Sequence, residues 1–464
     1  MVRLPFRFRY EPGNDILTGQ AGLGVVGQIL SRLPFGKRVQ TSKVPGAEHP
    51  DISHRDVVVA YLGLLAQGKN DFDHIEAFRK DRFFKTALDL EQVPSSPTLR
   101  QRLDQAAANE STVRWGQALN DSSDELLQRY AHLEPIQIGQ RQYIPLDMDV
   151  SPMDNSKTKK EGVSRTYKGC DGFAPNFAYL GHEGYALAVE FREGKQHCQK
   201  GTPAFLAECL KRAQRILPKN PENLEIPETE MAATLLVRLD SGNDSADNID
   251  TCHAAKADFL IKRNLRRERL EDWLALAKTE GTAESLRKGK TLYRGTTMRA
   301  PKAGHALERI VYEVVERTST ADGQLLLLPQ IDVATYWTSL PDEPAKVLPW
   351  YPDHGTMEQY HSEYKTDLDL ERLPSGKFAT NRLILQMALL VFNVLRVIGQ
   401  ATLADASVPL RTKVQRRRLR TIIQNLVLCA AKLVRHGRTV RVRYARTNPW
   451  GDVIGHLYTA FADT

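Results

Sequence analysis

The chain has 464 residues, a length that exceeds one ordinary hydrophobic core and predicts roughly two to four domains. An apolar fraction of 41% and a charged fraction of 26% are typical of a folded soluble protein and argue against extensive disorder. Five cysteines without a CxxC pair argue against a zinc ribbon or a disulfide framework, and they favour the cytoplasm as the location. The most apolar run, 383–395, contains Gln386 and Asn393, so we expect a buried helix and no membrane partner.

Positive charge is concentrated near the C-terminus. Between Arg411 and Arg446 the chain holds twelve Lys and Arg and no Asp or Glu, so the rest of the chain carries a net charge of −4 against a total of +8. A basic segment of this kind favours a polyanionic partner. The alternative is a solvated surface that keeps the protein soluble.

The N-terminal third is basic and then helical. Basic residues outnumber acidic ones within 1–50, which also holds several Gly and Pro, and this predicts a basic, partly extended arm. The next segment, 51–140, predicts a helical DNA-binding domain. Its first helix starts after the candidate cap Ser53 and ends at Gly68, and a second one follows over 71–80.

A third helix is expected to begin where Ser96 acts as the cap and Pro97 takes the first helical position. Leu99 and Leu103 would face inward. The residues left facing outward are Thr98, Arg100, Gln101 and Arg102. This pattern suits the recognition helix of a helix-turn-helix unit, although any small bundle with one basic helix gives the same pattern.

Over 141–263 the sequence pattern changes to alternating strands and helices, which predicts an α/β sheet. The stretch 264–350 is rich in strand patterns and is interpreted as an insertion. Helical patterns return over 351–405. The basic C-terminal region, 406–464, is expected to be helical as well.

Two aspartates, Asp149 and Asp240, each end an apolar strand, where an α/β sheet opens its functional edge. Carboxylates that converge repel one another, and a divalent cation with oxygen ligands, Mg²⁺ or Mn²⁺, is the expected way to keep them ionised. Two such ions about 4 Å apart can act on a phosphodiester. The alternative is that both aspartates are ordinary turn or cap residues.

The stretch "YPDHGTMEQYHSEYK" (351–365) supplies a third candidate carboxylate. If it is helical, at about 100° per residue one narrow arc holds four polar side chains: Tyr351, His354, Glu358 and Lys365. A surface helix often shows the same stripe. Pro352 and Gly355 also weaken the start of the helix.

These residues resemble a signature of bacterial insertion-sequence transposases of the DDE type: Tyr, two residues, Arg, three residues, Glu, six residues, Lys. Tyr351, Glu358 and Lys365 fit that spacing. His354 stands where the family has arginine, which replaces a permanent charge by one that depends on pH.

The two strand-end aspartates also resemble the family pattern. Asp149, in "LDMDVSPMDNS", is similar to the first catalytic aspartate, with Asp147 as the alternative on the same face. Asp240, in "VRLDSGNDSADN", is similar to the second, with Asp244 as a weaker alternative.

The resemblance covers most of the chain and implies a fold class. It implies an α/β protein with an RNase-H-like catalytic core in two parts, 141–263 and 351–405, interrupted by the β-rich insertion. Relatives use this insertion to grip transposon-end DNA. Trp337 and Tyr336 could therefore stack on an unpaired base, although packing in the insertion's own core is the more ordinary role for a tryptophan.

The function implied is cut-and-paste transposition. Asp149, Asp240 and Glu358 would be the catalytic residues and would bind two Mg²⁺ or Mn²⁺ ions. The predicted DNA contacts come from the active-site stretch, the third helix and the insertion: Tyr351, His354, Lys365, Arg100, Gln101, Arg102 and Trp337. Lys365 would contact a phosphate, and Tyr351 and His354 would position the active-site helix.

The partners implied are double-stranded DNA, both as terminal inverted repeats and as target, and a second copy of the chain in a synaptic homodimer. The location implied is the bacterial cytoplasm, in association with the nucleoid. Two alternatives remain open: an end-binding repressor without catalysis, and a metal-dependent nuclease that does not join strands.

Overall fold

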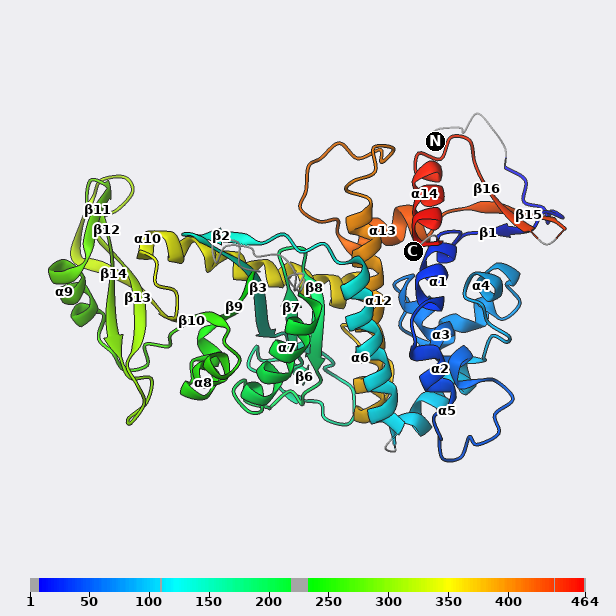
Figure 1. Ribbon diagram of the computed structural model, residues 1–464, viewed down its shortest axis with the longest axis horizontal. Helices are drawn as coiled ribbons and strands as arrows, with labels where there is room; N and C mark the ends of the chain where they lie inside the picture. The colour runs from blue at the N-terminus through cyan, green and yellow to red at the C-terminus, as the bar shows by residue number, and fades with distance from the viewer. Residues whose placement is uncertain (1–7, 109–110, 218–232, 438, 463–464) are drawn as a thin grey trace, which may run out of the picture.

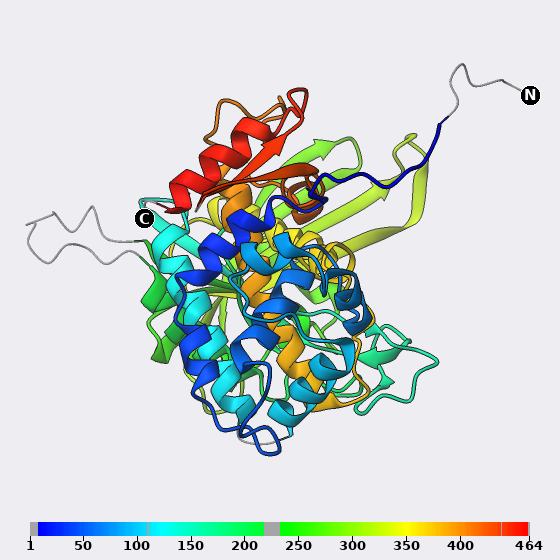
Figure 2. The same cartoon turned by 90° about the vertical axis from the view of Figure 1, so that its right-hand side faces the viewer.

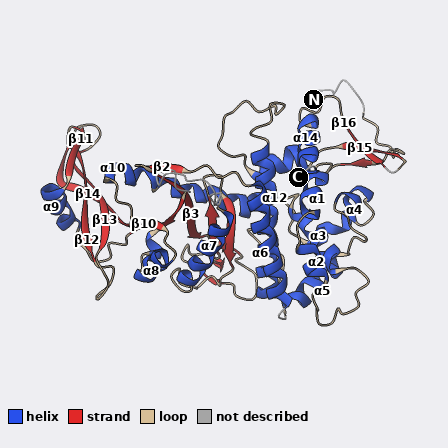
Figure 3. Ribbon diagram, viewed as in Figure 1, coloured by secondary structure: helices blue, strands red, loops and turns tan. Residues whose placement is uncertain are grey.

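A computed structural model describes residues 8–108, 111–217, 233–437 and 439–462. The molecule is elongated (Figure 1), with a strand-rich end, a central sheet and a helical end. Colouring by secondary structure separates these parts clearly (Figure 3). The described ends of the chain both lie at the helical end, where helices α1 and α14 pack together.

The central feature is one mixed sheet. Its order is β11-β12-β13-β14-β10-β9-β3-β7-β8, and β2 pairs with β3. The three strands β3, β9 and β10 run parallel, and the other pairs are antiparallel. The strands are β2 (Ile136–Ile138), β3 (Arg141–Val150), β7 (Asn176–Leu180), β8 (Tyr185–Glu190), β9 (Thr234–Leu239), β10 (Asp258–Lys262), β11 (Thr282–Arg287), β12 (Lys290–Arg299), β13 (Glu308–Ser319) and β14 (Leu325–Thr338).

The predicted β-rich insertion is continuous with this sheet, because β14 pairs with β10 over Tyr336–Thr338. Helix α9 (Leu270–Glu280) packs against its strands. The strand-rich stretch interpreted as an insertion is therefore joined edge to edge with the predicted α/β sheet. The buried end of β14, unlike its exposed start, supplies the apolar surface that extends the sheet.

Two helices that connect strands in sequence, one between β8 and β9 and one between β9 and β10, pack against the sheet. They are α7 (Thr202–Ile216), which packs against β8 and β9, and α8 (Ala246–Ala254), which packs against β10. A small second sheet has the order β4-β6-β5, with β4 (Met153–Asp154), β5 (Ser164–Arg165) and β6 (Asp171–Phe173).

Long helices α6 (Ser111–Tyr130) and α12 (Phe378–Ala401) pack together between the sheet and the N-terminal helices (Figure 1). Helix α12 is long and apolar enough to cross a membrane, but it is buried against α6, β8 and α5. The buried helix predicted over 383–395 is thus confirmed. The side-chain amide of Asn393 is fully hydrogen-bonded inside this core. Its Oδ1 accepts from the backbone N–H of Ala186, and its Nδ2 donates to the carbonyl of Ala186 and to the hydroxyl of Ser123.

The remaining N-terminal helices form a body seen face on in Figure 2, and their buried apolar residues belong to one continuous core with α6, α12 and the sheet. They are α1 (Leu23–Ser31), α2 (Phe35–Gln40), α3 (His54–Leu65), a 3-10 helix (Phe72–Phe78), α4 (Arg82–Ala87) and α5 (Ser96–Ala107). The predicted cap Ser53 is confirmed, since its side chain accepts from the backbone N–H of Asp56, and Gly68 takes the left-handed φ of +68° after α3.

The basic arm predicted over 1–50 was wrong for most of its length. Residues 1–7 lie outside the described part, but α1 and α2 are packed helices whose apolar residues are buried. The apolar spacing of "LGVVGQIL" carried that signal, and the basic residues around it hid it.

The C-terminal region is only partly helical. Helix α13 (Leu419–Ile422) continues into a π-helical turn (Ile423–Val427), and α14 (Gly451–Ala462) ends the described chain. Between them lies a hairpin of β15 (Ala431–His436) and β16 (Thr439–Tyr444), and β15 also pairs with β1 (Leu17–Thr18). The prediction of a wholly helical region is corrected by this three-stranded sheet.

Candidate active site

Asp149 and Asp240 lie side by side at one edge of the sheet. Strands β3 and β9 are parallel, and their register ends with Met148 opposite Leu239. An aspartate comes next along each strand: Asp149 follows Met148, and Asp240 follows Leu239. Parallel strands point their carboxyl ends the same way, so the alignment of β3 with β9 is what brings these two carboxylates together.

Charge repulsion within this group is strong at Asp149. Burial and the neighbouring charges of Asp240 and Glu358 raise the pKa of Asp149 to about 7, although the backbone N–H of Val150 donates to its Oδ1 at 2.7 Å. Glu358 itself is exposed in the first turn of α11 (Met357–Ser362). The three predicted carboxylates therefore lie within electrostatic range of one another.

Asp147, the alternative to Asp149, is used differently. Its carboxylate is buried and bonded on both oxygens by Arg238, with Nε to Oδ1 at 2.7 Å and Nη2 to Oδ2 at 2.6 Å. Burial opposes ionisation, but Arg238 and a hydrogen bond with His354 lower the pKa of Asp147 to about 2. A carboxylate already neutralised in this way is a poor metal ligand, and the structure favours Asp149.

His354 lies inside the protein. Its side chain is only 9% exposed, and its Nδ1 lies 3.0 Å from Oδ1 of Asp147. The DNA contact predicted for His354 was therefore wrong, because Asp147 and the surrounding core occupy its polar edge. The contact does fit the other predicted role, which is to fix the helix that carries Glu358 against β3.

Tyr351 is half-buried and positions the same segment. Its ring packs on Tyr336 with centroids 4.6 Å apart, and its hydroxyl donates to the carbonyl of Leu239 at 3.4 Å. The residue before Asp240 is thus tied to the segment before Glu358. Tyr336 is 9% exposed, so the stacking on an unpaired base proposed for it does not fit this packing.

Lys365 is half-buried, and its Nζ donates to the carbonyl of Pro152 at 2.5 Å, just beyond Asp149. Burial lowers the pKa of Lys365, and the charge of Glu358 acts against that shift. Because an ammonium group has three N–H donors, two remain for another acceptor. The phosphate contact predicted for Lys365 stays a prediction.

The predicted helix over 351–365 changes its pitch twice. It begins as a 3-10 helix (Pro352–Thr356), continues as α11 and ends in a π-helical turn (Glu363–Asp367). Pro352 and Gly355 account for the tight start, since neither favours a regular α-helix there. The single polar arc expected for a regular helix is therefore only approximate.

Nearly the whole chain matches one protein family. Residues 13–464 match the model of the family described as Transposase DDE domain group 1. The chain belongs to this family of DDE transposases. No curated protein matches it. Among solved structures the transposase is similar to a chain of the cryo-EM structure of a piggyBac transposase synaptic complex with hairpin DNA.

That similarity is weak: the TM-score is 0.38 and the identity 9%, over 88% of this chain and 80% of the other. A likeness at this level carries no argument about the fold or the site. The family match confirms the predicted resemblance to DDE transposases.

Trp337 of the transposase is a core residue, and the prediction that it contacts DNA was wrong. It is 3% exposed, its Nε1 donates to Oδ1 of Asp244 at 2.8 Å, and the guanidinium of Arg263 lies 4.7 Å from its ring. The other oxygen of Asp244 accepts from the backbone N–H of Asn264 at 2.9 Å. Asp244 is thus committed to structure, which leaves Asp240 as the second carboxylate.

We expect Trp337→Phe to lower stability while DNA affinity stays unchanged. Oδ1 of Asp244 loses its buried donor, which lowers the free energy of unfolding by about 1–3 kcal/mol, and the smaller ring leaves a cavity that lowers it further. Urea unfolding and DNA binding, measured on the same preparation, check this. Weaker DNA binding at unchanged stability would restore Trp337 as a DNA contact.

Helix α5 presents fewer polar side chains than predicted. Arg100 and Gln101 are exposed, but Arg102 is buried, donates to the carbonyl of Ile52 at 3.1 Å and lies 2.9 Å from Nδ1 of His54. Arg102 therefore joins α5 to α3, and its predicted DNA contact was wrong. The contacts predicted for Arg100 and Gln101 stay predictions.

Sequence reasoning missed three residues near the carboxylates. The Tyr167 hydroxyl donates to the carbonyl of Val150 at 3.1 Å, and burial with the charges of Asp149, Asp240 and Glu358 raises the pKa of Tyr167. Cys198 donates to the carbonyl of Gly242 at 3.0 Å, and burial with the charge of Asp240 raises its pKa, so it is a neutral thiol.

The third missed residue is Arg238. It was visible as the arginine of "R-x-D-S-G", but its partner Asp147 is on another strand. Besides binding Asp147, Arg238 donates from Nη1 to the carbonyl of Trp350 at 2.7 Å. It thereby links β9 to the start of the segment that carries Glu358.

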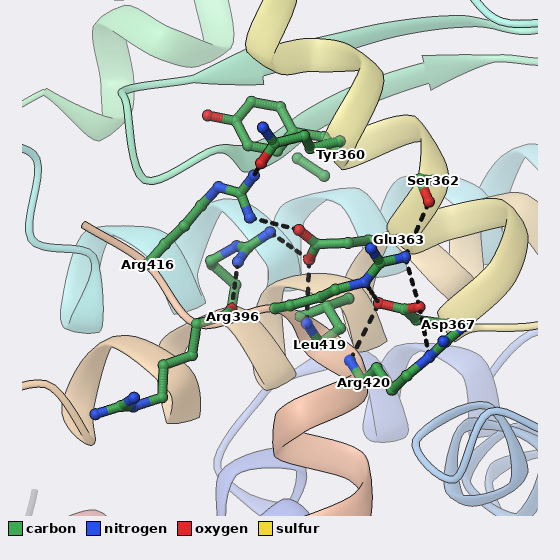
Figure 4. A network of polar contacts seen from close by, with 12 residues as sticks. Tyr360, Ser362, Glu363, Asp367, Arg396, Arg416, Leu419 and Arg420 are labelled. Atoms are coloured by element: carbon green, nitrogen blue, oxygen red, sulfur yellow. Dashed lines mark hydrogen bonds and ion pairs between the residues drawn. The ribbon is translucent and has the colours of Figure 1, made fainter. Parts of the chain in front are cut away.

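A buried charge network holds the end of that segment (Figure 4). Glu363 accepts from Arg396 Nη2 at 2.7 Å, from Arg416 Nη1 at 2.6 Å and from the backbone N–H of Leu419 at 3.2 Å. One turn later, Asp367 accepts from Arg418 Nε at 2.8 Å and lies 3.3 Å from Arg420 Nε. The active-site segment of the transposase is thus tied to α12 and to the basic C-terminal region.

The carboxylates fit a divalent cation by charge. Burial and, after it, the charge of Asp240 destabilise the anionic form of Asp149, which is the situation that a bound cation relieves. Within the described residues, no three His, Cys, Asp or Glu side chains are gathered closely enough to hold one ion as they stand. The exposed Glu358 side chain would have to turn inward to complete a site with Asp149 and Asp240.

Proposed function

We propose that this transposase binds the terminal inverted repeats of its own element, cuts the DNA there and joins the freed 3′ hydroxyls to target DNA. The observation that carries the proposal is the parallel register that places Asp149 beside Asp240, with Glu358 in electrostatic range. We further propose that β3, β7, β8, β9 and β10 with the active-site segment form the RNase-H-like core of the family.

In this proposal Asp149, Asp240 and Glu358 hold two Mg²⁺ or Mn²⁺ ions. Bound there, such ions supply activation of an attacking oxygen and stabilisation of the leaving oxygen of a phosphodiester. Lys365 contributes a charged donor to a phosphate beside the carboxylates, since its amine already lies next to the segment that follows Asp149.

The second layer of residues keeps these groups in place. Asp147 is the shared acceptor of Arg238 and His354, so β3, β9 and the active-site segment are joined at one carboxylate. Tyr351 adds a further link to the residue before Asp240. None of these four residues needs to touch DNA in order to matter for cutting.

DNA recognition is assigned in part to Arg100 and Gln101, which are exposed on α5. We also propose that two copies of the chain act together on paired ends, and that the protein works in the bacterial cytoplasm at the nucleoid. These assignments rest on the family.

The proposal predicts that Glu358→Gln abolishes cutting and leaves DNA binding intact. The change keeps the size of an exposed side chain and removes one ligand charge, and loss of one such group lowers a rate by at least about 10²-fold. Asp353→Asn, on the same segment, is the matched control and should cut normally.

Labelled element ends, a target plasmid and Mg²⁺ or Mn²⁺ form the assay. Cutting and joining by the wild type support the proposal. Cutting without joined product supports a nuclease, and binding without cutting supports a repressor. Normal cutting by the Glu358→Gln variant would remove Glu358 from the site.

A further inference from the structure

The structure divides the basic C-terminal residues into engaged and available groups. Arg416, Arg418 and Arg420 are bound by Glu363 and Asp367. Arg417 is buried and donates to the hydroxyl of Thr402 at 2.8 Å. Apart from Arg411 and Lys413, which are exposed, the basic residues of this first half therefore already have partners within the protein.

The second half is the β15–β16 hairpin, which projects from the body beside α14 (Figure 1) and lies at its top edge in Figure 2. Its register pairs Lys432 with Arg443 and Val434 with Arg441. Directly opposed residues share a face, so Lys432, Arg441 and Arg443 all lie on the same side of the ribbon. All three are exposed.

The other side of the ribbon is apolar at its base, where it faces the body, and carries the exposed Arg435 opposite Val440 farther out. Leu433, Val442 and Tyr444 are partly buried and pack against the main core. This packing fixes which side of the hairpin points outward. The basic side is therefore held in solvent by the fold and does not depend on the flexibility of the hairpin.

The outward side holds unneutralised charge. Lys432 pairs with Asp15 at 2.8 Å, but within the described residues no ion pair engages Arg441 or Arg443. The described hairpin strands contain no Asp or Glu. Arg446 just beyond β16 is exposed as well. Exposed arginines fixed on one face create a positive potential that attracts an anionic partner.

We propose that the outward face of the β15–β16 hairpin binds double-stranded DNA, with Arg441 and Arg443 on its phosphates; this rests on the proposed function. A two-stranded ribbon fits the major groove of B-DNA, and guanidinium groups bind phosphates with two parallel hydrogen bonds. Because these contacts go to the backbone, they position the DNA and do not read its sequence.

The test is the double variant Arg441→Gln with Arg443→Gln, measured for binding to a mixed-sequence duplex over a series of salt concentrations. Both side chains are exposed and unpaired, so the fold should survive, which thermal unfolding checks. The expected result is roughly tenfold weaker binding and a salt slope reduced by about two, or about one per lost phosphate contact. The double variant Lys211→Gln with Lys256→Gln, on α7 and just after α8, removes the same charge elsewhere and should bind as the wild type does.

Three outcomes overturn the inference. Equal losses in both double variants would mean that net charge alone acts. An unchanged affinity and salt slope, with aggregation of the hairpin variant, would mean that the arginines only protect the exposed edge strand β16. Absence of duplex binding by the wild type would overturn the proposed function together with the hairpin contact, whereas the first two outcomes leave the proposed function standing.

Discussion

Asp149→Asn is expected to give a protein at least as stable as the wild type that no longer cuts DNA, whereas Asp147→Asn is expected to be strongly destabilised. Burial, and after it repulsion by Asp240 and Glu358, disfavours the charge of Asp149, so removing that charge relieves a cost. Asp147 neutralises the buried Arg238, and its loss leaves that charge uncompensated, at about 3–5 kcal/mol. Two aspartates on one face of one strand should therefore respond in opposite directions.

In the presence of EDTA, the stability of the wild type relative to these two variants should depend on pH. The pKa of Asp149 is raised to about 7 in the folded protein, so folding favours its protonated form. Stability should be greatest near pH 4 and should fall as pH rises towards 7, by up to about 4 kcal/mol at about 1.4 kcal/mol per pKa unit. Asp149→Asn should remove most of this fall.

Asp147 acts with the opposite sign, because its pKa is lowered to about 2. The stability that it contributes is present above the unfolded pKa near 4 and is lost as pH falls towards 2. Urea unfolding of the wild type and both variants across this pH range, with cutting assayed at neutral pH, measures all of these effects. A stable, inactive Asp147→Asn variant would reverse the two assignments.

The sequence alone predicted a candidate site but could not separate the two aspartates. Apolar strands that end on Asp149 and Asp240 predicted that these two carboxylates lie together, which the register of β3 with β9 confirms, whereas their catalytic role with Glu358 stays a proposal. Asp147 and Asp149 share a face at period two, so no periodic pattern distinguishes them. The distinction comes from Arg238, which lies opposite Asp147 only once β3 and β9 are aligned.

Other errors have the same origin in contacts between distant segments. His354 and Arg102 are polar residues on predicted helix surfaces, and each is buried by a partner more than forty residues away. Trp337 is buried because Asp244 accepts its N–H and Arg263 covers its ring. A helical pattern gives the direction of a side chain, whereas the element packed there decides whether that direction is solvent.

Glu363→Gln is expected to destabilise the transposase far more than Asp367→Asn, although the two acids are one turn apart. Of the two arginines that pair with Glu363, Arg396 in α12 is fully buried and Arg416 is 10% exposed. Once Glu363 is neutral, Arg396 stays inside the protein without a counter-charge, at a cost of about 3–5 kcal/mol.

Asp367 is bound by Arg418 and Arg420, whose side chains are 44% and 47% exposed. Both can return to water when Asp367 is neutralised, so the expected loss is only about 1–2 kcal/mol of hydrogen bonding. The midpoints of urea unfolding, compared at an unchanged dependence of the unfolding free energy on urea, measure the difference in stability between the two variants. Glu363→Met combined with Arg396→Met should recover much of the loss, because an apolar pair needs no counter-charge. If the single and double variants are equally unstable, Arg416 and the Leu419 amide hold this segment, and the Arg396 pair does not.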